Sequence, residues 1–171
     1  MFHLIAHLII HFIVVTTQNV DNEISIYSCD FHTDREGEWS KSESNIEFCC
    51  GFATLRDDSS IWSTIPTNGY KSIHIDMMIY AGDLQNDDKC SFYYQAPSCT
   101  TTDEWQLAYQ ASTEGWSNVT VNVPEDCEND AGFQIKLASE SQSAATFENY
   151  CLFGHLKIYA AELSSNGLEG K

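Results

Sequence analysis

Apolar and polar residues alternate along several stretches of this chain, and a period of two is the pattern of a half-buried β-strand. The alternation is clearest over residues 71–80, where Ile73, Ile75 and Ile79 share one face. The same pattern, or a short apolar run bounded by turn residues, recurs in further segments: 24–30, 46–54, 60–64, 90–95, 104–110, 118–124, 132–139 and 154–163. The pattern therefore predicts about nine short strands.

Polar connectors rich in Gly, Asn, Asp and Ser separate these strands, and no segment beyond the apolar N-terminus has a clean helical period. Short strands with turn signals about every ten residues are typical of an all-β sandwich or barrel. We expect a single antiparallel β-sandwich of the jelly-roll kind over residues 19–163. Residues 164–171 have no period and predict a flexible C-terminal tail.

The first segment, "MFHLIAHLIIHFIVV", is apolar and contains no Lys, Arg, Asp or Glu. It is too short to cross a hydrocarbon core of about 30 Å as a helix. We interpret residues 1–18 as a secretory signal peptide, although no Lys or Arg precedes the apolar run. His3, His7 and His11 would align on one helical face, either as a metal-binding stripe or as the polar face of a segment that is removed.

The chain has 171 residues, and 25 acidic against 8 basic side chains give a net charge of −17. Such a charge excludes nucleic acid and anionic membrane surfaces as partners, because both require clustered Lys and Arg. Apolar residues make up 43% of the chain, which is enough to form a core. The sequon Asn118-Val119-Thr120 predicts N-glycosylation of Asn118 on the polar side of its strand. We therefore expect a secreted protein with no membrane span after signal removal.

Three segments resemble the MAM family of secreted jelly-roll domains. They are "CDFHTDREGEW" (29–39), "IHIDMMIYAGDLQNDDKCSFYYQ" (73–95) and "GFQIKLASESQSAATFENYCLFGHLKIY" (132–159). The chain departs from the family pattern in two places, because Glu38 stands where a second cysteine is expected before Trp39, and Gly154-His155 replaces an acidic pair. The resemblance implies a binding or adhesive module on a β-sandwich.

Seven cysteines follow the apolar segment, without any Cys-x-x-Cys pair, so that we expect disulfides rather than a metal or redox site. In sandwiches of this kind the first strand often lies near the early strands of its own sheet, and this favours a bond between Cys29 and Cys50. Seven cysteines allow many connectivities. Our expected bridges are Cys90–Cys99, Cys127–Cys151 and Cys29–Cys50.

The odd cysteine belongs to the pair Cys49-Cys50. Alternation along residues 46–54 points Cys50 into the core and Cys49 outward. Cys49 then remains unpaired, and it either joins a second chain or is a partly buried, inert thiol. A bond between chains would make the protein a homo-oligomer.

Acidic residues recur in the loop "PEDCENDAG", where Asp126, Glu128 and Asp130 follow one another at every second position. Carboxylates in this rhythm can bind Ca²⁺, which takes 6–8 oxygen ligands. The EF-hand pattern fails, because Ala131 stands where the invariant glycine is required. Asx turns in a solvated loop are the other interpretation. We retain Ca²⁺ as a candidate cofactor on these three carboxylates.

Aromatic residues are frequent in "CSFYYQ", and they either fill the core or form a platform on which sugars stack. The tryptophans that could extend such a platform are Trp39, Trp62, Trp105 and Trp116. A catalytic site is not indicated, because the three histidines beyond the apolar segment (His32, His74 and His155) are far apart and no Gly-x-Ser-x-Gly or His-Glu-x-x-His motif occurs.

We therefore predict that the protein is not an enzyme. The main hypothesis is a secreted, glycosylated module for cell adhesion, extracellular matrix or surface fibres, acting through an extracellular protein or through self-association by Cys49. The alternative hypothesis is a calcium-dependent carbohydrate-binding domain with glycan partners.

Overall fold

The computed structural model describes residues 23–42, 45–85, 87–99, 104–141 and 149–163. The expected signal peptide and C-terminal tail lie outside the described residues. Eleven strands and two short 3₁₀ helices occur within them. The strands are β1 (Glu23–Cys29), β2 (Ser40–Lys41), β3 (Ile46–Cys49), β4 (Phe52–Arg56), β5 (Ser59–Thr64), β6 (Tyr70–Gly82), β7 (Lys89–Gln95), β8 (Gln106–Ala111), β9 (Gly115–Asn122), β10 (Gln134–Glu140) and β11 (Tyr150–Glu162), and the helices are η1 (Thr33–Glu38) and η2 (Glu125–Cys127).

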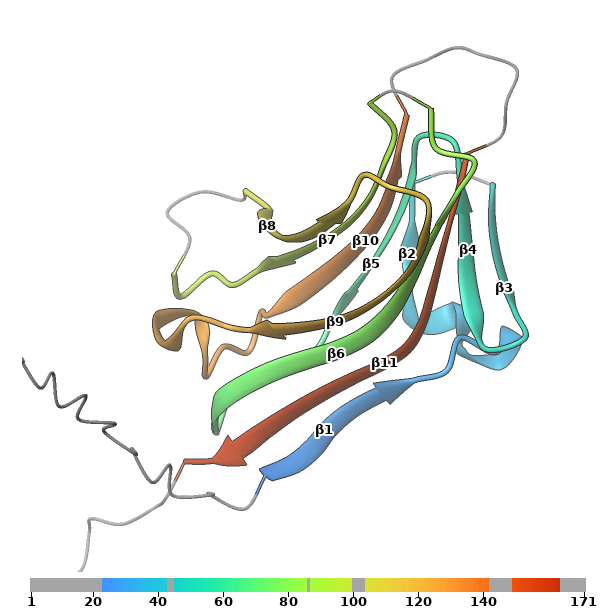
Figure 1. The fold of residues 1–171 in the computed structure, drawn as a ribbon. Helices are drawn as coiled ribbons and strands as arrows, with labels where there is room; N and C mark the ends of the chain where they lie inside the picture. The colour runs from blue at the N-terminus through green and yellow to red at the C-terminus, as the bar shows by residue number, and fades with distance from the viewer. Residues whose placement is uncertain (1–22, 43–44, 86, 100–103, 142–148, 164–171) are drawn as a thin grey trace, which may run out of the picture.

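Two antiparallel sheets pack face to face, which confirms the predicted β-sandwich (Figure 1). Sheet A has the order β3-β4-β11-β6-β9, and β1 also pairs with β11. Sheet B has the order β2-β5-β10-β7-β8. Figure 1 shows the strands of both sheets bending in the same direction, with sheet B on the inner side of the bend. The outer face of sheet B is therefore the concave face of the molecule.

Eleven strands replace the predicted nine for two reasons. Strand β2 has only two residues, which is too short for a period to be visible. The predicted strand 46–54 is a hairpin, because Cys50 and Gly51 both have positive φ, 58° and 90°. Two consecutive residues with positive φ form the type I′ turn that suits a tight β-hairpin. Cys50 is consequently exposed in the turn, and its expected inward orientation is wrong.

The core lies between the sheets and contains the residues that alternate inward along the long strands. Ile75 and Ile79 of β6 and Leu137 of β10 have no exposed surface. Strand β11 is central because it pairs with β6 along one side, and with β4 and then β1 along the other. The change of partner coincides with a register shift after Gly154, where His155 has a φ of 51°.

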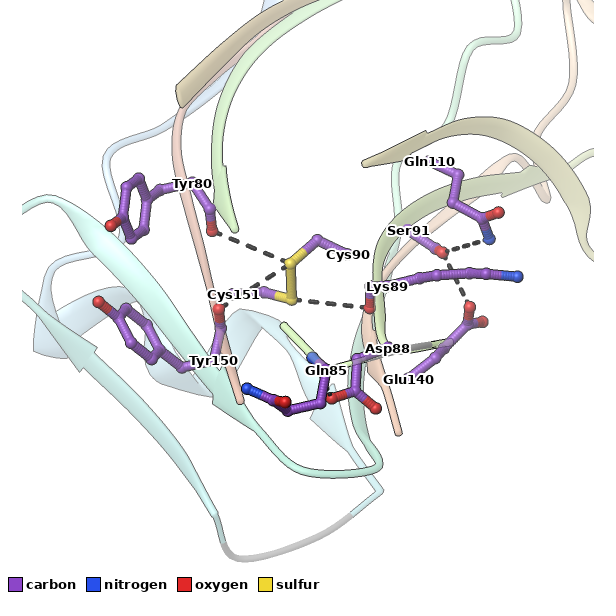
Figure 2. Close-up of a disulfide and its surroundings, with 10 residues drawn as sticks. All are labelled: Tyr80, Gln85, Asp88, Lys89, Cys90, Ser91, Gln110, Glu140, Tyr150 and Cys151. Carbon is purple, nitrogen blue, oxygen red and sulfur yellow. Dashed lines mark hydrogen bonds between the residues drawn. A yellow bond between two sulfur atoms is a disulfide. The ribbon is translucent and has the colours of Figure 1, made fainter. Parts of the chain in front are cut away.

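The structure corrects the expected disulfides. The bonds are Cys90–Cys151 and Cys99–Cys127, so the four predicted cysteines are bonded but with exchanged partners. Cys90 lies on β7 of sheet B and Cys151 on β11 of sheet A, and this bond therefore joins the two sheets (Figure 2). Proximity along the chain misled the prediction because these strands become neighbours only through the sandwich.

The expected Cys29–Cys50 bond is also absent from the described residues. Cys29 is a buried free thiol in the core, whereas Cys50 is exposed beside Cys49.

Candidate functional site

The outer face of sheet B brings aromatic and polar side chains together from separate parts of the chain. Lys136 is the central residue of this face, because on β10 it stands opposite Trp62 of β5 on one side and Tyr93 of β7 on the other. The strand period explains this placement, since Ile135 and Leu137 point into the core and Lys136 points outward. We call Trp62, Tyr93, Trp105, Lys136, Glu140 and Gln110 the sheet B face.

Two aromatic rings hold the ammonium group of Lys136. Its Nζ atom lies 4.6 Å from the ring centroid of Tyr93 and 5.2 Å from that of Trp105, one residue before β8. Both distances are in the range of cation–π attraction. Burial lowers the pKa of Lys136, while the nearby carboxylates of Glu140 and Asp58 oppose that change.

A chain of hydrogen bonds runs beside these rings. The hydroxyl of Tyr93 donates to Glu140 Oε1, and Ser91 Oγ donates to Glu140 Oε2 at 2.9 Å. Gln110 Nε2 donates to Ser91 Oγ at 3.0 Å (Figure 2). Burial, together with the hydrogen bond to Glu140, raises the pKa of Tyr93 to about 12. The phenol is therefore neutral at physiological pH and remains a donor.

The face thus combines flat apolar rings with carboxylate, amide and hydroxyl groups. Leu107 of β8, which stands opposite Tyr93, is 53% exposed and extends the apolar part. Sites for small polar ligands have this composition, in which apolar walls carry a few oriented polar groups.

The outer face of sheet A carries a second aromatic cluster. The Trp116 ring centroid lies 5.6 Å from that of Phe52 and 5.0 Å from that of Tyr80, and Tyr80 lies 5.8 Å from Tyr150. A Cβ atom at Gly154 would meet the Phe52 ring at 2.5 Å, so the glycine leaves the space in which this ring lies. We call Phe52, Tyr80, Trp116 and Tyr150 the sheet A face.

The sequence predicted the aromatic residues only in part. Within "CSFYYQ", Phe92 and Tyr94 are buried in the core and Tyr93 points outward, so each of the two interpretations holds for some of the residues. Trp39 is buried, which removes it from any surface platform. Lys136, Glu140 and Gln110 were not predicted, and only the outward position of Lys136 in the strand 132–139 could have indicated them.

Two of the three predicted calcium ligands already accept hydrogen bonds from backbone N–H groups, most of them in other segments of the chain. Glu128 Oε1 accepts the N–H of Ile73 at 2.7 Å, and the Asp130 carboxylate accepts the N–H groups of Ser98 and Gly132, both at 2.6 Å. Burial disfavours the charge of Asp130, but these hydrogen bonds outweigh it and lower its pKa. Asp126 is exposed.

The described ranges contain no group of three His, Cys, Asp or Glu side chains that could hold a metal ion. The three histidines also lie apart. His32 is 3.4 Å from Asp30, His74 is 2.9 Å from Glu23, and His155 packs against Phe52.

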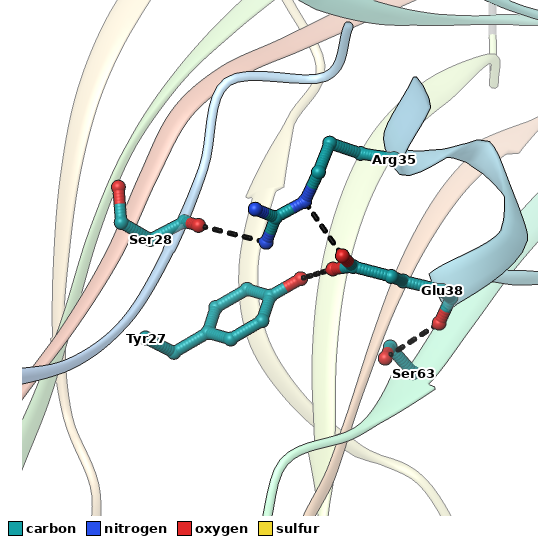
Figure 3. Close-up of polar contacts among 5 residues, drawn as sticks. All are labelled: Tyr27, Ser28, Arg35, Glu38 and Ser63. Carbon is teal, nitrogen blue, oxygen red and sulfur yellow. Dashed lines mark hydrogen bonds and ion pairs between the residues drawn. The ribbon is translucent and has the colours of Figure 1, made fainter. Parts of the chain in front are cut away.

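A further polar cluster fixes η1 to β1 (Figure 3). Arg35 Nε lies 2.7 Å from Glu38 Oε1, and Arg35 Nη2 donates to the carbonyl of Ser28 at 3.2 Å. The Tyr27 hydroxyl donates to Glu38 Oε2 at 3.2 Å. The pKa of Tyr27 is raised, and burial is the largest cause. These contacts all join residues of the chain to one another, so we assign the cluster of Tyr27, Arg35 and Glu38 a structural role.

No protein-family model matches the chain, and no curated protein matches its sequence. Solved structures do match its fold. The N-terminal CBM22-1-CBM22-2 tandem domain of Paenibacillus barcinonensis Xyn10C is 13% identical, with a TM-score of 0.53 over 80% of this chain and 50% of that one.

Two more matches are of the same kind. The CBM22-1-GH10 modules of Clostridium thermocellum endo-1,4-beta-D-xylanase 10B, complexed with xylohexaose, are 8% identical, with a TM-score of 0.52 over 86% of this chain and 30% of that one. CBM29_1, a family 29 carbohydrate-binding module from Piromyces equi, is 10% identical, with a TM-score of 0.50 over 85% of this chain and 94% of that one.

The chain thus spans half the length or less of the two structures that contain CBM22 modules, but nearly all of CBM29_1. At these identities the matches show the fold alone, a β-sandwich that this chain shares with these three structures. The resemblance to the MAM family stays a prediction. Among the described residues, no helix has the length and apolar character needed to cross a membrane.

Proposed function

We propose that this protein is a non-catalytic carbohydrate-binding module and that its glycan lies on the sheet B face. The observation that carries the proposal is the position of Tyr93 and Trp105 around Lys136, next to the Glu140 carboxylate, on the concave side of the sandwich. The fold shared with carbohydrate-binding modules supports it.

The chemistry of a sugar fits these groups. The C–H edges of a pyranose ring pack on an aromatic ring, and its hydroxyl groups exchange hydrogen bonds with carboxylate and amide groups. Glu140 accepts such bonds, while Gln110 and Lys136 donate them. The net charge of −17 repels acidic polysaccharides, so we propose a neutral glycan as the ligand.

Titration calorimetry on the full chain tests this proposal, with xylohexaose as the first probe and a panel of neutral oligosaccharides after it. Trp105→Ala should weaken binding about five- to tenfold, because a lost stacking contact is worth about 1–1.4 kcal/mol. Trp116→Ala on sheet A is the matched control and should leave the affinity unchanged. If no neutral glycan binds, or if only Trp116→Ala weakens binding, the proposal is wrong.

Calcium dependence is tested separately. Because Glu128 and Asp130 already accept backbone N–H groups, we expect EDTA to leave glycan binding unchanged. Loss of binding in EDTA, together with loss in Asp126→Asn, would restore the calcium-dependent alternative. Asp126 is the suitable position because its side chain is exposed.

Adhesion or assembly through protein contacts remains a second proposal, and the exposed position of Cys49 supports it. The two structural disulfides support secretion. Light scattering of the secreted protein without reductant distinguishes a single chain from a disulfide-linked assembly.

A further inference from the structure

Strand β9 presents Trp116, Asn118 and Thr120 in succession on the outer face of sheet A. All three are exposed, whereas Val119 between them is buried. Alternate residues on one face of a strand are about 6.4–6.8 Å apart. Asn118, the acceptor asparagine of the sequon, is therefore the next residue after Trp116 on this face of the strand, and Trp116 is 53% exposed.

Neighbouring aromatic side chains fix the orientation of the Trp116 ring. Phe52 and Tyr80 contact its ring, and Gly154 provides the space in which Phe52 lies. Across the strand pair, Trp116 stands opposite Tyr80 and Asn118 stands opposite Met78. The result is an oriented, half-exposed indole ring beside Asn118, and a ring of this kind can pack against the apolar face of a sugar.

We propose that Asn118 carries an N-linked glycan whose first sugar packs on the indole ring of Trp116, so that the glycan covers the sheet A face. In the attachment step, Asn118 Nδ2 attacks C1 of the sugar of a lipid-linked oligosaccharide. The N–C1 bond forms, the bond from C1 to the diphosphate oxygen breaks, and the lipid diphosphate and one Nδ2 proton leave. This proposal does not rest on glycan recognition by the sheet B face. That face lies on the other sheet, where a glycan at Asn118 would not cover it.

A glycan attached at the sequon residue Asn118 would account for the exposed ring of Trp116. Asn118 lies on the same face of β9 as Trp116, so its first sugar can reach the indole ring without a separate partner. The proposed ligand of this ring is therefore the carbohydrate attached at Asn118. A second copy of the chain or a free ligand on this face would be different outcomes of the test.

The experiment uses the full chain secreted from eukaryotic cells. Intact mass before and after peptide N-glycosidase should show one occupied site at Asn118, absent in Asn118→Gln. In the glycoprotein, the acetyl methyl resonance of the first sugar should shift upfield and show a nuclear Overhauser contact to the Trp116 ring. An unoccupied Asn118, or a sugar with unshifted resonances and no contact, would overturn the proposal.

Thermal unfolding provides the second measurement. Enzymatic removal of the glycan should lower the Tm of the wild type by about 2–4 °C. The same treatment should change the Tm of Trp116→Ala by much less, while Trp105→Ala, on the other sheet, should behave like the wild type. If Trp116→Ala does not fold, Trp116→Phe replaces it and should keep part of the effect. Equal losses in all variants would mean that the glycan does not contact Trp116.

Discussion

Cys90 and Cys151 connect the two sheets of the sandwich, with their Cα atoms 5.6 Å apart and both side chains fully buried. The carbonyl oxygens of Tyr80 and Tyr150 lie 3.9 and 4.0 Å from Cys90 Sγ, while the rings of the same tyrosines lie on the opposite side of sheet A (Figure 2). The bond therefore fixes sheet B to the part of sheet A that carries the aromatic cluster.

Removal of this bond should cost more stability than removal of the other one. The sequence separation is 61 residues for Cys90–Cys151 and 28 for Cys99–Cys127. Loop-closure entropy then predicts losses of about 4.3 and 3.6 kcal/mol. Cys90→Ala/Cys151→Ala also removes fully buried atoms from the core, and this increases the difference. Urea unfolding of the two double variants measures the order, and a larger loss in Cys99→Ala/Cys127→Ala would contradict it.

Gly154→Ala should destabilise the protein by about 1–3 kcal/mol, because the new methyl group forces the Phe52 ring out of its position. The nearest ring atom is 2.5 Å and the carbonyl oxygen of Gly51 is 3.1 Å from the added carbon. Gly37→Ala is the control, since nothing lies within 4 Å of its added carbon. Chemical denaturation of both variants decides the question, and equal stability of the two would refute the proposed role of Gly154.

The sequence predicted the strands where one face is buried, because alternation along β6, β9 and β10 is a direct consequence of the sandwich. It failed at Cys50, since "FCCGF" reads as a continuous apolar run and only Gly51 indicates a turn. The period was extrapolated through the hairpin, and Cys50 was therefore placed in the core.

The site could not be predicted to the same extent. Tyr93, Trp105 and Lys136 lie on different segments, and their proximity depends on the pairing of β10 with β7. Alternation gives the face on which a side chain lies but does not give the strand order. The disulfide partners failed for the same reason, because Cys90 and Cys151 face each other only when the two sheets pack.

Alkaline pH should destabilise the protein partly through Tyr93. Burial and its hydrogen bond to Glu140 raise the pKa of this phenol to about 12 in the folded state, against an ordinary value near 10. Between these values the folded state holds a proton that the unfolded state releases, so stability falls as the pH rises through this window. Tyr93→Phe should lose stability less steeply over this range, as measured by denaturant unfolding at several pH values.

Absorbance titration of tyrosinate provides the control for this prediction. Glu140→Gln removes the negative charge that helps to raise the pKa of Tyr93 and leaves only a neutral amide oxygen as acceptor, so it should move one phenol titration toward its ordinary value. Burial, which raises the pKa, and the hydrogen bond with Ser91, which lowers it, both remain in that variant. Identical titration curves for the wild type and Glu140→Gln would mean that the Glu140 charge does not raise the pKa of Tyr93.

The three cysteines outside the disulfides should differ in reactivity. Cys49 and Cys50 are exposed, with their sulfur atoms 2.6 Å apart, whereas Cys29 is buried. After mild reduction, iodoacetamide should label the tryptic peptide 42–56, which contains both exposed thiols, and should reach Cys29 only after unfolding. Labelling of Cys29 in the folded protein would contradict its place in the core.

The same peptide tests whether Cys49 joins two chains. Thiols this close have a high effective concentration for each other. With oxidised glutathione as the oxidant, we expect Cys49 and Cys50 to form one bond within the chain, while the glutathione disulfide is reduced to two thiols. Peptide 42–56 would then be two hydrogens lighter in a monomer. Cys49→Ser is the control, because its single remaining thiol cannot close this ring. A wild-type dimer linked through two copies of the peptide would instead establish the bond between chains, which is one of the two alternatives that the sequence leaves open for Cys49.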